Sequence, residues 1–343
     1  MLRIHFTDRD LATTRIAAEP DPLWELSLSM HQLRLRESNP FLAGWKREVG
    51  RRLQPGGPAR RDVSLLLALN PPRGYFPDFL TPYESTRGFE TGLDAVLGTS
   101  KQRLRREIGM LPDVPPAIRP MIEGIGRGHR GSLEALGAGL RRYHDLALAP
   151  VWGHVSAAVT MDRALRARQL VDGGLAAVLG NLHPCARFTD NVLEIGVHGR
   201  AADMYLDGRG LLLIPSYFKE TRQLMVLVDA DLPPVLVYPV DVAARLATDL
   251  ARRGADGASA GLGGGLLSAP LTALIGRTRA LVLEAAATGG TTSEIARWLG
   301  VSVPVASKHL TVLRNCGLVA SIRDRNAVHH ALTELGLALL AGS

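Results

Sequence analysis

The sequence has few cysteines, few lysines and few aromatic residues, and it lacks a long apolar run. Its two cysteines, Cys185 and Cys316, lie far apart among 343 residues, so a disulfide framework is excluded and a reducing compartment is expected. No stretch of about 18 residues is uninterruptedly apolar, which argues against a transmembrane helix. The first residues include charged side chains such as Arg3 and Asp8, which argues against a signal peptide. We therefore expect a cytoplasmic protein without a membrane span.

The composition limits what the charge can tell us. Aromatic residues make up 5% of the chain and apolar residues 46%, so we expect folded cores built mainly of Leu, Val and Ala. The formal net charge is +7, which favours a polyanionic partner only weakly. Basic residues are almost all arginine; the four lysines are Lys46, Lys101, Lys219 and Lys308. This bias, with abundant Ala and Gly, is typical of a G+C-rich bacterial genome.

The length allows two or three domains. Arg252–Ser268 contains six glycines and has little periodicity, and such a composition behaves as a flexible coil. We predict an α+β protein with an effector-binding or dimerisation region over residues 1–252, a glycine-rich linker over 253–268 and a compact C-terminal module over 269–343. Within the first region, residues 1–182 are predicted to be mostly helical and residues 183–252 strand-rich.

Periodicity places several elements in the N-terminal region. Apolar residues at helical spacing predict an amphipathic helix over Leu23–Arg36, which Pro22 would begin. Gly208 and Gly210 tolerate positive φ, so Asp207–Gly210 is predicted to be a hairpin turn between two short strands. The further elements predicted are strands at Arg3–Thr7, Val192–Val197, Ala202–Leu206, Leu211–Pro215 and Val235–Tyr238, and helices at Ser132–Leu148, Trp152–Ala176 and Asp241–Arg252.

The most informative pattern begins at Thr291. A hydroxyl at Thr291 and a carboxylate at Glu294 have the spacing of a capping box, which predicts a short helix with Ile295, Ala296 and Leu299 on its buried side. Gly300 then permits a left-handed turn that ends this helix. Ser302 is a suitable N-cap for a second helix, whose first turn tolerates Pro304.

The second helix has one apolar stripe and one polar face. Ala306, Leu310 and Leu313 fall at i, i+4 and i+7, which predicts a core stripe. A polar face on a short helix after a tight turn is what reading the major groove of DNA requires. Two strands, Leu318–Arg323 and Ala327–Leu332, would then form a basic hairpin. The residues predicted to contact DNA are Ser302, Val303, Val305, Ser307, Lys308, His309, Thr311, Arg314, Arg323 and Arg325.

These residues resemble a known family. Thr292–Ser302, Ser307–Leu310 and Gly317–Val319 are similar to the winged helix-turn-helix of the arsenical-resistance-repressor (ArsR-type) transcription regulators. The resemblance covers 269–342 and implies a winged helix fold and DNA binding. Pro77–Leu80 and Gly210–Phe218 more weakly resemble an uncharacterised domain that precedes such winged helices in high-G+C bacterial regulators. The cysteine pair of metal-sensing relatives is missing from Thr292–Leu299, so thiolate metal sensing is not expected.

The remaining residues with reactive or metal-binding side chains form no catalytic pattern. The adjacent residues His329 and His330 lie in one predicted strand and would point to opposite faces, so they cannot form a metal site alone. Cys316, at a helix end, is predicted to be a small buried side chain. Three residues near a proline-broken junction are predicted to line a ligand pocket: Tyr143, Trp152 and His154. The alternative for these three is an ordinary core.

Together the patterns predict a DNA-binding transcription regulator rather than an enzyme. We expect a ligand-responsive homodimer, acting as a repressor on a palindromic double-stranded operator, with a small-molecule effector and with neither a metal nor another cofactor. The effector would bind between the helices and the strand-rich section. Two other classes remain open for the N-terminal region: an enzyme acting on a small metabolite, fused to a DNA-binding module, and a platform for protein interactions.

Overall fold

The computed structural model divides the chain into two compact units, Met1–Val240 and Asp241–Ser343. The residues that the structure describes are 1–35, 42–54, 58–71, 74–111, 114–183, 185–196, 202–219, 224–227, 234–240, 271, 274–287, 290–299, 301–324, 327–333, 335–336 and 339–340. The predicted linker 253–268 and the predicted helix 241–252 lie outside the described residues. Mixed helix and sheet, with a helix-turn-helix in the second unit, make this an α+β protein, as the sequence predicts.

The first unit contains two four-stranded sheets. One has the order β3 (Ala186–Thr189), β4 (Val192–Ile195), β1 (Leu2–His5) and β5 (Ala202–Tyr205). The other has the order β2 (Arg15–Ile16), β6 (Leu212–Ser216), β8 (Val235–Pro239) and β7 (Met225–Leu227). In both sheets, strands from the first 16 residues pair with strands beyond residue 190. The mostly helical and strand-rich parts are therefore one unit.

The strand β6 lies between two hydrophobic cores. Leu212 and Ile214 face a helical core, while Leu213 faces a second core that includes the first sheet. The neighbouring strand β8 alternates in the same way, as the two-residue period of a strand requires. Both strands are buried along their whole length, which is typical of strands covered on both faces.

The predicted hairpin at Asp207–Gly210 is wrong. The turn itself forms, with positive φ at Asp207, Gly208 and Gly210, but it does not join paired strands. The strand before it, β5, pairs in parallel with β1 of the first sheet, and the strand after it, β6, pairs with β2 and β8 of the second. A turn sequence fixes the local backbone, whereas strand pairing depends on distant partners.

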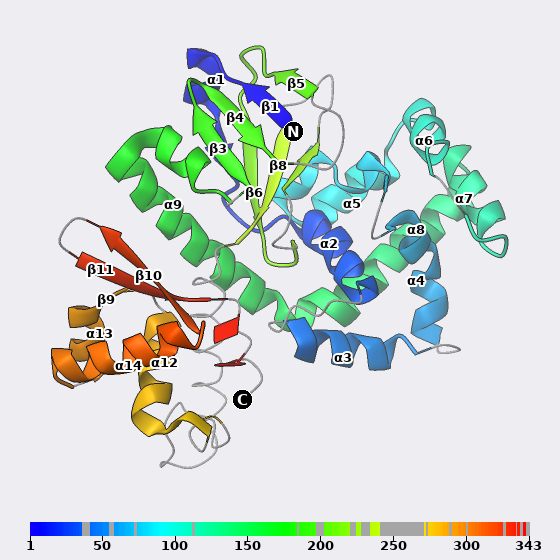
Figure 1. Ribbon diagram of the computed structural model, residues 1–343. Coiled ribbons are helices and arrows are strands. Elements are labelled where there is room, and N and C mark those ends of the chain that lie inside the picture. The colour runs from blue at the N-terminus through cyan, green and yellow to red at the C-terminus, as the bar shows by residue number, and fades with distance from the viewer. Residues whose placement is uncertain are drawn as a thin grey trace. The chain divides into compact units, whose positions relative to one another are not determined.

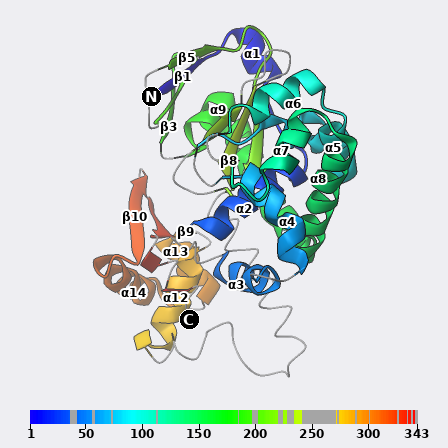
Figure 2. The same ribbon diagram turned by 90° about the vertical axis from the view of Figure 1, so that its right-hand side faces the viewer.

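Helices form most of the rest of the first unit (Figures 1 and 2). The long helix α9 is interrupted by non-helical Gly173 and Gly174, and it packs on β3 and β6. The helices are α1 (Asp8–Thr13), α2 (Pro22–Arg34), α3 (Ala43–Arg52), α4 (Pro58–Leu69), α5 (Phe89–Leu97), α6 (Lys101–Ile108), α7 (Arg119–Gly126), α8 (Arg130–Tyr143) and α9 (Trp152–Gly180). Short 3₁₀-helical turns occur at Asp78–Leu80, Tyr83–Arg87 and Ala149–Val151, and a π-helical turn occurs at His144–Leu148.

Helix α2 is buried on all sides rather than amphipathic, which corrects the prediction for this segment. All residues from Pro22 to Gln32 are buried, so its polar side chains must find partners inside the protein. The carboxylate of Glu25 accepts hydrogen bonds from the Ser216 hydroxyl (2.8 Å) and from the backbone N–H groups of Tyr217 (2.6 Å) and Phe218 (3.0 Å). The buried carboxylate thus ties α2 to the end of β6.

The described part of the second unit combines helices with a small sheet. Its described elements are α12 (Arg277–Ala287), β9 (Gly290–Thr291), α13 (Thr292–Leu299), α14 (Val303–Asn315), β10 (Val319–Asp324) and β11 (Ala327–Leu332). The three helices contact one another, and the sheet has the order β10-β11-β9 with antiparallel pairing. The predicted hairpin after the second helix is thus confirmed (Figure 1).

Candidate nucleic-acid interface

The predicted capping box starts α13. The Thr291 N–H donates to Glu294 Oε2 (2.8 Å), and the Glu294 N–H donates to Thr291 Oγ1 (3.3 Å). These reciprocal bonds satisfy two backbone N–H groups that the helix would otherwise leave free. At the other end, the Val301 N–H donates to the Ala296 carbonyl (3.0 Å). Gly300, predicted to permit this turn, lies outside the described residues.

Helix α14 packs against the rest of its domain through the apolar stripe predicted from the sequence. Ala306, Leu310 and Leu313 are buried. The helix ends as expected at Gly317, whose φ is +71°, and the Leu318 N–H donates to the Leu313 carbonyl (2.9 Å). This pattern closes a helix with a left-handed glycine. The packed stripe fixes which side of α14 faces solvent.

The exposed side of α14 carries most of the predicted DNA contacts. Val303 is 46% exposed and Val305 40% exposed, although an apolar side chain is normally buried. Exposed apolar atoms next to polar ones suit a groove in which thymine methyl groups alternate with hydrogen-bonding base edges. The predicted contact residues that are exposed are Ser302, Val303, Val305, Ser307, Lys308, Thr311 and Arg314.

Ser302 stands at the N-cap of α14 as predicted, but its side chain makes no capping hydrogen bond. An N-cap side chain normally accepts a bond from the second or third N–H of the helix. The exposed Ser302 hydroxyl is therefore not needed to start the helix.

His309 differs from the other predicted contacts because it is only partly exposed. Its Nδ1 is buried and finds no hydrogen-bond partner among the described residues. Burial, together with the charges of Arg279 and Lys308, lowers the pKa of His309. A neutral ring attracts phosphate less than a cation does, so His309 suits a base contact better than a phosphate contact. Arg279 on α12 is the neighbour that the sequence pattern did not reveal.

The hairpin β10–β11 forms the wing. Its register pairs Arg323 with Val328, so the backbone of Arg323 lies at the end of the hairpin, next to the turn. The side chain of Arg323 and all of Arg325 lie outside the described residues. His330 is buried and bonds to both neighbours: its Nε2 is 2.8 Å from Thr292 Oγ1 and its Nδ1 is 2.9 Å from Ser321 Oγ. The wing is thereby attached to the first helix of the helix-turn-helix.

The two cysteines lie in different environments. Cys316, predicted to be a small buried side chain, is exposed at the C-cap of α14. Cys185 is half-buried, and its Sγ is 2.8 Å from Nδ1 of His183. Within the part of the chain that the structure describes, no three side chains of His, Cys, Asp or Glu gather as a metal site would require.

The three predicted ligand contacts lie outside one pocket of the first unit. Tyr143 is fully buried and its hydroxyl is 3.0 Å from the Ser29 hydroxyl, while Trp152 and His154 are half-buried. None of the three lines the pocket formed by α2, the Tyr83–Arg87 turn and the second sheet. The ordinary-core alternative fits Tyr143, and a ligand role for the three gains no support from the pocket.

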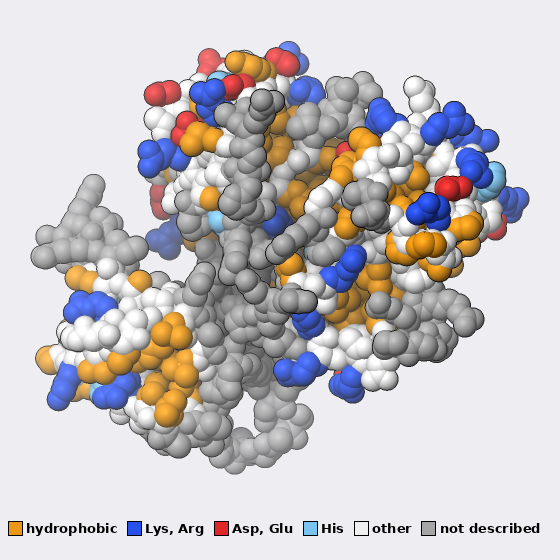
Figure 3. Space-filling view, turned by 45° about the vertical axis from the view of Figure 1, so that its right-hand side comes forward, with side chains coloured by type: hydrophobic (Ala, Val, Ile, Leu, Met, Phe, Trp, Pro, Cys, Tyr) orange, Lys and Arg blue, Asp and Glu red, His pale blue; other side chains and the backbone are white. Residues whose placement is uncertain are grey.

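Basic side chains are not confined to the second unit. Figure 3 shows arginine and lysine side chains on the surfaces of both units, so the net charge of +7 is spread over the chain. Charge alone therefore does not locate the nucleic-acid interface. Among the described residues, no helix has the length and apolarity needed to span a bilayer.

A capped helix, a second helix that follows closely and has an exposed face, and a β-hairpin define a winged helix-turn-helix, a class of DNA-binding domain. Residues 290–321 match the family model described as bacterial regulatory protein, arsR family. The second unit thus carries an ArsR-type helix-turn-helix, which supports a function in DNA-binding transcription regulation. The match does not extend to the first unit. Comparisons with curated proteins and with solved structures found no match.

Proposed function

We propose that the chain is a dimeric, ligand-responsive transcription regulator that acts as a repressor in the bacterial cytoplasm. The observation that carries the proposal is the exposed face of α14 within a domain whose other helices and wing are packed behind it. In this proposal the first unit binds a small molecule and catalyses no reaction.

The residues of α14 divide into two roles. Lys308 and Thr311 stand on the exposed face beside Ser307 and present donors and acceptors to base edges, with Ser302, Val303 and Val305 at the N-terminal end. Arg314 lies near the C-terminal end of the helix, where a guanidinium reaches the sugar-phosphate chain. Phosphate contacts orient a protein on DNA, and base contacts specify the sequence. Arg323 and Arg325 of the wing are proposed to contact phosphate as well.

A two-fold dimer would present two copies of α14 to a palindromic operator. The half-sites would lie roughly one helical turn of DNA apart, about 34–36 Å. An effector would release or strengthen binding only if its affinity differs between the DNA-competent and the incompetent state. The pocket of the first unit supports this part of the proposal, since it lies between helices and strands, where an effector site is expected.

The proposal is tested with the full chain and an operator selected from random DNA. Lys308→Ala should weaken operator binding and relax the base preference at one position, by about 1–3 kcal/mol for a specific contact. Arg314→Ala should weaken binding to all sequences similarly and reduce the salt slope by about one. Lys101→Ala, an exposed lysine of α6 in the first unit, is the matched control and should leave binding unchanged.

Two results would contradict the proposal. Selection that recovers no preferred sequence, or operator affinity that neither Lys308→Ala nor Arg314→Ala changes, would remove α14 as the reading helix. The dimer is tested separately by the stoichiometry of the operator complex, for which two chains per palindrome are expected. A fragment of the first unit that turns over a metabolite would favour a fused enzyme instead.

A further inference from the structure

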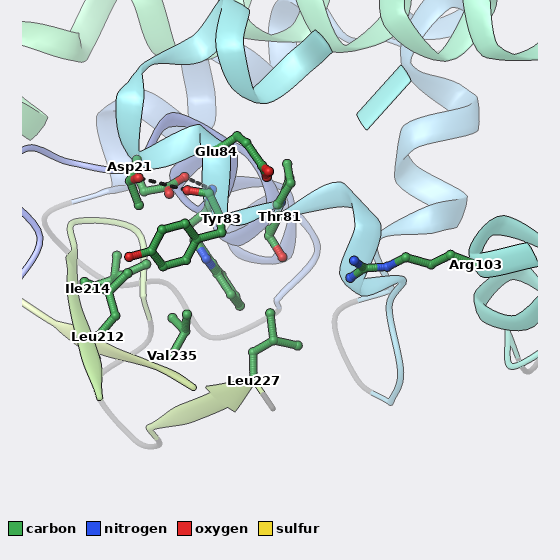
Figure 4. Close-up of a pocket in the computed structure, with 12 residues that line it drawn as sticks. Asp21, Thr81, Tyr83, Glu84, Arg103, Leu212, Ile214, Leu227 and Val235 are labelled. Carbon is green, nitrogen blue, oxygen red and sulfur yellow. Dashed lines mark hydrogen bonds between the residues drawn. The ribbon is translucent and has the colours of Figure 1, made fainter. Parts of the chain in front are cut away.

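A cavity of about 100 Å³ lies in the first unit, between the beginning of α2, the Tyr83–Arg87 turn and one face of the second sheet. Figure 4 shows the Tyr83 ring above Leu212, Ile214 and Val235, with Leu227 beside them. The lining residues are Asp21, Trp24, Thr81, Pro82, Tyr83, Glu84, Thr86, Arg103, Leu212, Ile214, Leu227 and Val235. The floor is thus apolar, and the polar groups come from the helical side.

Two aromatic side chains line the cavity and are fixed by their neighbours. Trp24 is buried and packs edge-on against Phe76, with ring centroids 6.1 Å apart. The Tyr83 hydroxyl is hydrogen-bonded by Arg15, whose guanidinium lies 5.9 Å from the ring centroid. The faces of Trp and Tyr rings attract cations through their quadrupoles. Arg15 itself is exposed, so solvent screens its charge.

With one exception, the charged side chains of the lining have hydrogen-bond partners among the described residues. Asp21 caps α2, because its Oδ1 accepts from the N–H groups of Leu23 and Trp24, each at 3.0 Å, and its Oδ2 accepts from the Ser85 hydroxyl (2.6 Å). Arg103 donates to Glu107 Oε1 at 2.6 Å.

Glu84 is the exception. Its half-buried carboxylate forms neither a hydrogen bond nor an ion pair with any residue that the structure describes, and Figure 4 places it next to Thr81 on the same turn as Tyr83. A carboxylate at the wall of a cavity attracts a cation that enters the cavity. Among the described residues, the cavity wall therefore carries one carboxylate without a protein partner, together with the side chains of Tyr83 and Trp24.

We propose that this cavity binds an organic ammonium group, either quaternary or a protonated amine, and that this cation is the effector of the proposed function. Aromatic rings combined with a carboxylate are the chemistry that holds such cations. The volume sets the size of the group, since a cavity of roughly 150 Å³ admits benzene. A head group smaller than benzene enters, and the remainder of the ligand projects outward. The bound cation contacts both the helices and the second sheet.

The test uses choline as the probe and calorimetric titration of the full chain. The comparison ligand is the uncharged isostere of choline, in which a tert-butyl group replaces the trimethylammonium group. Choline should bind at least about tenfold more tightly than the isostere, which corresponds to about 1.4 kcal/mol. Glu84→Gln and Tyr83→Leu should each weaken choline binding by about tenfold. Choline should also change operator affinity in the wild type and not in Glu84→Gln.

Matched controls lie in the same unit. Glu90→Gln removes an exposed carboxylate that pairs with Arg141 (2.8 Å), and Tyr205→Leu removes an exposed ring that stacks on His5. Neither change should alter choline binding. Equal affinity for the uncharged isostere, or equal choline affinity in Glu84→Gln and in wild type, would overturn the inference. Operator binding without choline binding would overturn it and leave DNA binding intact, whereas choline binding without operator binding would overturn only the proposed function.

Discussion

His330 of β11 and Thr292 of α13 share a hydrogen bond of 2.8 Å between Nε2 and Oγ1. The other ring nitrogen, Nδ1, is 2.9 Å from the Ser321 hydroxyl of β10. One buried imidazole therefore holds together both strands of the wing and the first residue of α13. Thr292 and His330 are 38 residues apart, so the relationship was not visible in the sequence, where His330 was only assigned to a strand.

Replacing His330 should loosen the wing. His330→Phe retains the ring and removes both hydrogen-bonding nitrogens, which leaves the Thr292 and Ser321 hydroxyls without this partner. The expected loss of stability is about 1–3 kcal/mol, seen as faster hydrogen exchange in peptides covering β10, β11 and the start of α13. His5→Phe, on the exposed stack with Tyr205, is the control. Unchanged exchange in His330→Phe would show that the imidazole is not what attaches the wing.

The two N-caps of the helix-turn-helix should respond differently to alanine. Thr291→Ala removes the hydroxyl that accepts from the Glu294 N–H and should cost about 1 kcal/mol, measured by urea denaturation. Ser302→Ala removes a side chain that makes no capping bond, so its effect on stability should be smaller while operator binding weakens. Equal destabilisation by both changes would contradict the difference between the two caps.

Replacing the Glu25 carboxylate by an amide should destabilise the protein. In Glu25→Gln, the side-chain NH₂ would face a group that now donates to the carboxylate, such as the N–H of Tyr217 or Phe218. A buried donor facing a donor loses its hydrogen bond, and bonds to charged groups are the stronger ones, so the expected cost is roughly 3 kcal/mol. Glu134→Gln is the control, because this exposed carboxylate pairs with exposed Arg130 at the surface. Urea denaturation of both variants distinguishes them.

Two buried groups of the first unit should give opposite pH dependences. Burial, with the charges of Lys219 and Arg34, lowers the pKa of His31 to about 4, so its contribution to stability is present above about pH 6.5 and is lost as the pH falls. Burial raises the pKa of Asp21 to about 6, so its contribution is present at low pH and is lost as the pH rises through about 6. Between pH 4 and 6 the two effects oppose each other.

Asp21→Asn should leave only the pH dependence of stability that His31 contributes to this pair. Asparagine also caps helices well and does not titrate, so the stability of the variant relative to wild type should rise by about 1–2 kcal/mol between pH 4.5 and 6.5. Urea denaturation at the two pH values measures this difference. Adding His31→Gln to Asp21→Asn should remove the pH dependence of stability that this pair of residues still causes. A stability difference that stays constant with pH would contradict the raised pKa of Asp21.

The second unit could be predicted from sequence because its signals are local. Thr291 and Glu294 are three residues apart, and Leu310 and Leu313 lie on one helix face. Gly317 ends the helix through its own left-handed backbone conformation. The exposure of Cys316 was missed because a helix end can face either way, and burial there depends on the neighbouring elements.

The pocket could not be predicted in the same way. Its walls come from α2, from the Tyr83–Arg87 turn and from β6, β7 and β8, whose pairing depends on partners that are distant in sequence. Tyr143, Trp152 and His154 are close in sequence, which favours a shared pocket, whereas the structure buries Tyr143 in the core. Signals that are local in sequence located helix α14 and its exposed face, but not this cavity.

The pairing of β1 with β4 and β5 has a consequence for biosynthesis. Residues 2–5 leave the ribosome long before residues 192–205 are made, so this sheet cannot close until most of the first unit has been translated. Contacts of such long sequence separation slow folding, and nascent edges left open in the meantime invite aggregation. During synthesis, the first unit should consequently depend on chaperones more than the small, locally stabilised second unit does.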